Sequence, residues 1–221
     1  MKRFPQELDQ LTSDLVALAE KVEETIRDSV RALDERLPEL ARRVITGDEV
    51  IDREEVRIEE ECVRILVLST PVAGDLRRVI AVLKINNDLE RIADLAVDIA
   101  ERAEELAGGP EGPPIPSVLI SMEEQAIRMV SDCLNAFVGS DVELARSVLA
   151  MDDGVDRLYL LALDECKAMI RTNPDQVDAA FRLASVARYL ERMADHATNI
   201  AEDVVYLMEG EVIRHQGKGA G

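Results

Sequence analysis

Histidine, cysteine and aromatic residues, which build many catalytic and metal sites, are scarce in this chain of 221 residues. It has two His, three Cys and no Trp, and 3% of its residues are aromatic. The cysteines, Cys62, Cys133 and Cys166, form no CxxC pair and are odd in number, which argues against a disulfide framework and a Cys/His zinc site. We therefore predict that the three thiols are small core residues.

Catalytic motifs are missing as well. The sequence has no Gly-rich loop ending in Lys-Ser/Thr, no nucleophile elbow and no HExxH motif. With two histidines, an enzyme built from this sequence would have to be a metal hydrolase or oxidase, and we expect no enzymatic activity.

Basic residues and long apolar runs are also in short supply. Asp and Glu number 45 against 26 Lys and Arg, which gives a net charge of −19. This balance argues against nucleic acid as a partner, because phosphate binding needs basic side chains; it suits cations, basic protein surfaces or solubility. No apolar run reaches membrane-spanning length, and residues 1–10 lack the apolar stretch of a signal peptide. We expect a cytoplasmic protein, peripheral to a membrane at most.

Apolar residues, at 47% of the chain, are numerous enough to exclude an acidic disordered protein. They recur every three or four positions, which is the helical period, as at Leu11, Leu15, Leu18, Val22 and Ile26. No segment alternates for long with the period of a strand. The sequence therefore predicts an all-α protein.

An internal repeat divides the chain. Residues 39–48, ELARRVITGD, match residues 143–152, ELARSVLAMD, and residues 88–101, DLERIADLAVDIAE, match residues 189–202, YLERMADHATNIAE. The offset is 104 in the first block and 101 in the second. We predict two tandem, pseudo-symmetric three-helix bundles. The expected division is 1–106 for the first bundle, 107–116 for a Pro/Gly linker, 117–210 for the second bundle and 211–221 for a flexible tail.

Proline and glycine residues set the expected helix ends. Asp141 is a candidate N-cap, and Asp48 and Asp152 are expected at helix starts, where carboxylates favour free N–H groups. The predicted helices are 7–37, 38–46, 48–68 and 71–106, then 117–138, 141–150, 152–171 and 174–209.

Four pairs of carboxylates have the i, i+4 spacing that places both on one helical face. They are Asp48 with Asp52, Glu90 with Asp94, Asp152 with Asp156, and Glu191 with Asp195. In an antiparallel hairpin, residues at equal distances from the turn lie at the same height. A turn at Pro71 places Asp48 level with Asp94 and Asp52 level with Glu90, and a turn at 173–174 does the same for the second repeat.

Four carboxylates at one height repel one another unless a cation offsets the repulsion. An all-oxygen ligand set suits iron, manganese, magnesium or calcium better than zinc. The alternative is that these faces point outward and bind only sodium and water. Arg91 and Arg192 are expected on the solvated surface, with neutralisation of the clusters as the alternative. We expect His196 to point away from the cluster, as a packing or surface residue.

These motifs resemble the PhoU family of phosphate-uptake regulators. The resemblance rests on PVAGDLRRVIAVLKINNDLERIADLAVDIAER (71–102), VARYLERMADHATNIAE (186–202), and the segments DEVID (48–52) and DDGVD (152–156). It implies two three-helix bundles and metal clusters, iron in some members, held by the eight carboxylates named above. The second copy lacks a counterpart of PVAGDLRR, so a role of that segment is assigned to the first copy only.

The resemblance also implies a negative regulator of phosphate uptake and of the phosphate-starvation response. Its expected partners are the cytoplasmic ATPase subunit of a phosphate ABC transporter and a sensor histidine kinase, with a homodimer also considered. Two other functions stay open from the residues alone: an iron-storage or oxidase bundle, and a helical scaffold whose acidic faces contact a basic partner without metal.

Overall fold

The computed structural model describes residues 3–107 and 114–210, and nearly all of them are helical. The first half contains α1 (Arg3–Asp34), α2 (Pro38–Ser69) and α3 (Ala73–Ala107). The second half contains α4 (Ser117–Gly139), α5 (Val142–Thr172), the 3-10 turn η1 (Pro174–Gln176) and α6 (Val177–Glu209). The all-α prediction and the two three-helix bundles are confirmed. The tail 211–221 and most of the expected linker lie outside the described residues.

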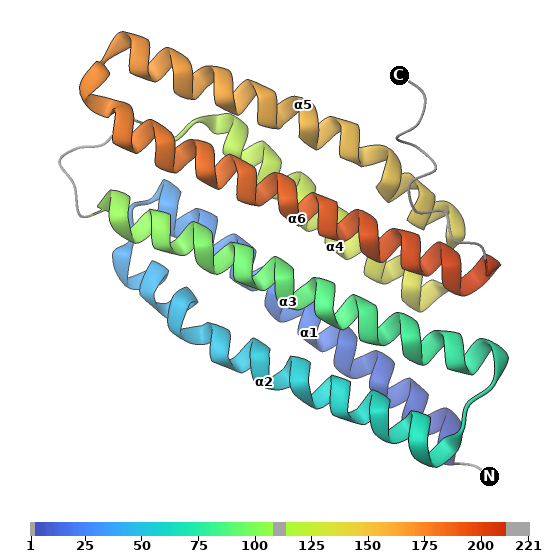
Figure 1. The fold of residues 1–221 in the computed structure, drawn as a ribbon. Helices are drawn as coiled ribbons and strands as arrows, with labels where there is room; N and C mark the ends of the chain where they lie inside the picture. The colour runs from blue at the N-terminus through green and yellow to red at the C-terminus, as the bar shows by residue number, and fades with distance from the viewer. Residues whose placement is uncertain (1–2, 108–113, 211–221) are drawn as a thin grey trace.

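The two halves pack against each other through the helices that carry the repeated LER motifs. In Figure 1, α3 and α6 lie side by side in the middle, with α2 and α5 on opposite outer sides. Helices α1 and α4 are also in contact. Buried apolar residues of both halves therefore form one continuous core. Its largest fully buried side chain is Phe137, and Cys62, Cys133 and Cys166 are free and buried, as predicted.

The hairpin turns lie where proline predicted them. Helix α2 ends at Ser69, and Thr70 and Ala73 adopt left-handed backbone angles on either side of Pro71. In the second half, Asn173 caps η1 by accepting a hydrogen bond from the backbone N–H of Asp175 at 3.2 Å. The Asp141 side chain accepts a hydrogen bond from the N–H of Leu144 at 3.0 Å, which confirms the predicted N-cap.

Two predicted helix breaks are wrong. Helices α2 and α5 run without interruption through residues 47 and 151, so Asp48 and Asp152 lie inside helices and not at their starts. Gly47 keeps its backbone N–H and costs a helix interior only about 1 kcal/mol relative to Ala. The buried neighbours Val44 and Ile51, one turn away on either side, hold this stretch against the core.

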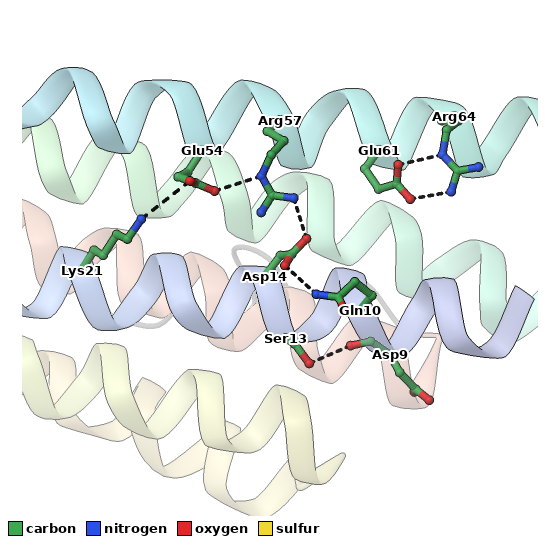
Figure 2. Close-up of polar contacts among 9 residues, drawn as sticks. All are labelled: Asp9, Gln10, Ser13, Asp14, Lys21, Glu54, Arg57, Glu61 and Arg64. Atoms are coloured by element: carbon green, nitrogen blue, oxygen red, sulfur yellow. Dashed lines mark hydrogen bonds and ion pairs between the residues drawn. The ribbon is translucent and has the colours of Figure 1, made fainter. Parts of the chain in front are cut away.

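Ion pairs join α1 to the side of α2 that faces it (Figure 2). Arg57 donates to Asp14 at 2.7 Å and to Glu54 at 3.0 Å. Burial alone would raise the pKa of Asp14, but hydrogen bonds from Arg57 and Gln10 hold that pKa below its ordinary value. These contacts fix the outer helix that carries half of the first carboxylate set.

Candidate functional site

Hairpin geometry brings the carboxylates of the first repeat together between α2 and α3. The pKa of Asp48 is raised to about 6, first by burial and then by the charges of Asp52 and Asp94. The pKa of Glu90 is also raised, first by burial and then chiefly by Asp94, with Asp52 contributing. Asp48 thus lies near Asp94 and Asp52 near Glu90, in the register expected of a turn at Pro71. We call these four residues the first cluster.

The second repeat shows the same arrangement between α5 and α6. The pKa of Glu191 is raised, first by burial, then by Asp195, and also by Asp156 and Asp152. Arg188 offsets part of this repulsion, because it donates a hydrogen bond to Glu191 Oε1 at 2.6 Å. We call Asp152, Asp156, Glu191 and Asp195 the second cluster.

Arg91 contacts the first cluster directly, which corrects the expectation of a merely solvated residue. Its guanidinium lies 3.3 Å from the carboxylate of Glu90 and 3.2 Å from that of Asp94. Arg192, its counterpart in the second repeat, is exposed like Arg91, but in the described part of the chain the ion pair to Glu191 comes from Arg188. The arginine contact therefore comes from a different position in each repeat: Arg91 in the first and Arg188 in the second.

The donor chemistry of both clusters fits a hard cation. Each cluster has one buried carboxylate oxygen without a hydrogen-bond partner: Oδ1 of Asp48 in the first and Oε2 of Glu191 in the second. An anionic oxygen left in this state is costly, and a cation would satisfy it. However, no three His, Cys, Asp or Glu side chains among the described residues are placed so as to hold one ion. Metal binding thus stays a prediction, and it requires the carboxylates to rotate toward a common centre.

His196 points away from the second cluster, as expected, but it has a polar partner that the sequence did not reveal. Its Nδ1 lies 2.8 Å from Oδ1 of Asp88, across the contact between α6 and α3. Asn199 reaches the same oxygen at 3.4 Å, and Lys84 of α3 donates to Asp203 of α6 at 2.8 Å. A polar seam therefore joins the halves on the side of α3 that faces away from the first cluster.

Sequence reasoning also missed Glu55 and Asn86, which lie beside the first cluster. Asn86 is fully buried and donates hydrogen bonds to the backbone carbonyl of Glu55 at 2.9 Å and to its Oε1 at 3.0 Å. The signal was available in the spacing, because Asn86 precedes Glu90 by four residues and Glu55 follows Asp52 by three.

The described helices contain none that is long and apolar enough to cross a membrane. This finding agrees with the absence of long apolar runs in the sequence.

Comparisons with known proteins agree with the repeat and the fold. The family model for the PhoU domain matches residues 15–103 and again residues 119–204. A phosphate-specific transport system accessory protein PhoU homolog of Aquifex aeolicus is 42% identical, over 98% of this chain and 97% of its own length. A protein with the same description from Pseudomonas putida is 40% identical, over 98% of this chain and 84% of its own length.

Solved structures extend this similarity to three dimensions. The crystal structure of PhoU from Pseudomonas aeruginosa superposes with a TM-score of 0.89 at 39% identity, over 94% of this chain and all of that one. The phosphate transport system regulatory protein PhoU from Streptococcus pneumoniae gives a TM-score of 0.88 at 29% identity, over 95% and 98% of the two chains. With two matching domains and close relatives over nearly its whole length, the chain belongs to the PhoU family.

Proposed function

We propose that this protein regulates phosphate uptake as a cytoplasmic, non-enzymatic adaptor that binds metal. It represses the phosphate-starvation response when phosphate is plentiful. The observation that carries the regulatory role is full-length membership of the PhoU family, whose relatives are described as accessory proteins of a phosphate transport system. Its partners on this proposal are the cytoplasmic ATPase subunit of a phosphate transporter and a sensor histidine kinase.

Metal would act on the geometry of the hairpins. Each cluster joins an outer helix to a central one, α2 to α3 and α5 to α6, and its carboxylates repel one another without a counterion. A bound cation, with iron favoured by the family resemblance and manganese, magnesium or calcium as alternatives, supplies charge neutralisation. With their charges neutralised, the carboxylates would hold the two helices of each hairpin in one relative position. The surface that meets a partner would then be preorganised for binding.

The regulatory proposal is tested in a deletion strain grown with abundant phosphate. We expect starvation genes to be expressed without the protein and silenced again by the wild-type chain. Genes that stay silent in the deletion strain would refute regulation. A second complementation, with all eight cluster carboxylates changed to Asn or Gln, separates the roles: full rescue by a folded, metal-free variant would remove metal from the mechanism.

Metal binding is tested on purified protein without an affinity tag. Glu90→Ala with Asp94→Ala should remove metal from the first cluster and leave the second loaded, because the clusters draw ligands from separate hairpins. Equal metal content in variant and wild type would contradict the site. Oxygen consumption by iron-loaded protein checks the iron-oxidase alternative, which predicts turnover where the adaptor predicts none.

A further inference from the structure

The two repeats differ beside their carboxylate clusters. With the offset of 104 that relates α2 to α5, Glu55 corresponds to Tyr159. With the offset of 101 that relates α3 to α6, Asn86 corresponds to Ala187. The polar pair of the first repeat thus has no counterpart in the second.

Asn86 holds Glu55 in a fixed position. The asparagine is fully buried, and its Nδ2 donates to both the main-chain carbonyl and the Oε1 of Glu55, at 2.9 and 3.0 Å. Its Oδ1 is buried without a hydrogen-bond partner. A buried amide oxygen without a donor is unfavourable, and its place beside a group of carboxylates suits a cation or a water bound to one.

Glu55 belongs electrostatically to the first cluster. It lies on the same face of α2 as Asp52, and its charge interacts with those of Asp52 and Glu90. On the facing helix, Asn86, Glu90 and Asp94 form one stripe at intervals of four residues. The first cluster is therefore continuous with the Asn86–Glu55 pair.

The second cluster has an aromatic ring at the equivalent place. The guanidinium carbon of Arg188 lies 5.9 Å from the centre of the Tyr159 ring, and Arg188 also donates to Glu191. Because Arg91 contacts the first cluster in a similar way, each cluster has one arginine and the arginines do not distinguish them.

Two other acids of the first repeat also lack an acidic counterpart: Asp98, whose charge interacts with Asp94, and Glu59, whose charge interacts with Glu55; the equivalent residues are Asn199 and Leu163. Glu55 differs from both because a buried side chain, Asn86, holds it beside the first cluster.

We propose that Glu55 is an additional ligand of the first cluster, that Asn86 positions it, and that the first cluster therefore binds a hard divalent cation more tightly than the second. This inference rests on the metal binding proposed above. Glu55 is already fixed by its asparagine, whereas the other carboxylates must rotate to converge on an ion. A fixed ligand loses less conformational freedom on binding.

The test is a titration of the metal-stripped full-length chain with Mn²⁺, followed by calorimetry and by electron paramagnetic resonance. We expect a tight and a weak class of sites. Glu55→Gln should weaken the tight class by about tenfold and leave the weak class unchanged. Glu60→Gln is the matched control, because Glu60 is an exposed acid of the same helix whose charge is not among those that shift the pKa of Glu55. An equal loss in both variants would mean that only overall charge matters, and it would overturn the proposal.

The role of Asn86 is tested through Glu55. Asn86→Ala should weaken the tight class in the wild-type background and have no further effect in the Glu55→Gln background, whatever it does to stability. Additive losses would show that Asn86 does not act through Glu55. If the wild type has two classes of sites with equal Mn²⁺ affinity and Glu55→Gln changes neither, this inference is wrong. The proposed metal-binding adaptor would not be affected by that result. No Mn²⁺ binding by the wild type, with iron also failing to bind, would refute both.

Discussion

Replacing Asp48 with Asn removes one negative charge from the first cluster and keeps the size of the side chain. We expect the metal-free protein to become more stable at about pH 8 as a result. The pKa of Asp48 is about 6, against an ordinary value of 3.8, because burial and then the charges of Asp52 and Asp94 disfavour its ionised form. Its ionisation therefore destabilises the folded state.

The size of the effect follows from this pKa. A rise of about two corresponds to roughly 3 kcal/mol when nothing screens the charges. Asp48 is partly exposed, so solvent reduces the figure, and we take about half, roughly 1.5 kcal/mol. For a chain of 221 residues this corresponds to a rise in Tm of about 3–6 °C.

The pH dependence has a defined sign. A carboxyl whose pKa is raised in the folded state stabilises the fold below its unfolded pKa, and this contribution is lost as the pH rises through the folded pKa. The variant and the wild type should therefore have similar free energies of unfolding near pH 4 and differ most near pH 8.

The assay is urea denaturation of chelator-treated protein at several pH values. Glu49→Gln, a change in an exposed acid one residue along, is the control. An equal gain in the control, or no gain for Asp48→Asn at high pH, would refute repulsion within the first cluster. With Mn²⁺ present, the wild type should have the larger free energy of unfolding, because the Asp48→Asn variant lacks a ligand.

Three further changes probe other parts of the fold by urea denaturation. Lys84→Met should destabilise the fold by about 2 kcal/mol, because the Asp203 side chain, only 3% exposed, loses its ion pair with Lys84. Adding Asp203→Asn should restore most of this stability, and additive losses would contradict the coupling. Asp141→Ala should remove the cap on the N–H of Leu144 and destabilise by about 1 kcal/mol, and no loss would mean that another group caps α5. Burial raises the pKa of Glu123 to about 7, so Glu123→Gln should stabilise by about 1–2 kcal/mol at pH 8 and have little effect below pH 4.5; a gain independent of pH would exclude this cause.

The fold was predictable because its signals are local and repeated. Helical periodicity, the near-midpoint repeat and the prolines at hairpin turns each depend on residues close in sequence. The register of the first hairpin followed from the turn at Pro71, and the interactions of Asp48 with Asp94 and of Glu90 with Asp52 agree with it. The false break in α2 arose because glycine is typical of a helix end, whereas tertiary packing supports a helix through Gly47.

The contacts between helices distant in sequence were not predictable in the same way. The sequence places Asp88 two residues before Glu90 but does not say that α6 covers that side of α3. Likewise, spacing places Asn86 and Glu55 on the faces of the first cluster, but their hydrogen bonds to each other depend on how α2 packs against α3. Such pairs depend on which helices pack together, and no single-helix pattern contains that information.

Helix α3 takes part both in the first cluster and in the contact between the two halves. One face presents Glu90 and Asp94 to α2, and another presents Lys84 and Asp88 to α6. A rigid helix that moves to close the first cluster must also move the contacts it makes with α6, the helix that carries Glu191 and Asp195. Because packed interiors resist continuous deformation, the shared core opposes such a movement, and we expect an ion in the first cluster to be met by rotation of its carboxylates, with the second cluster unchanged.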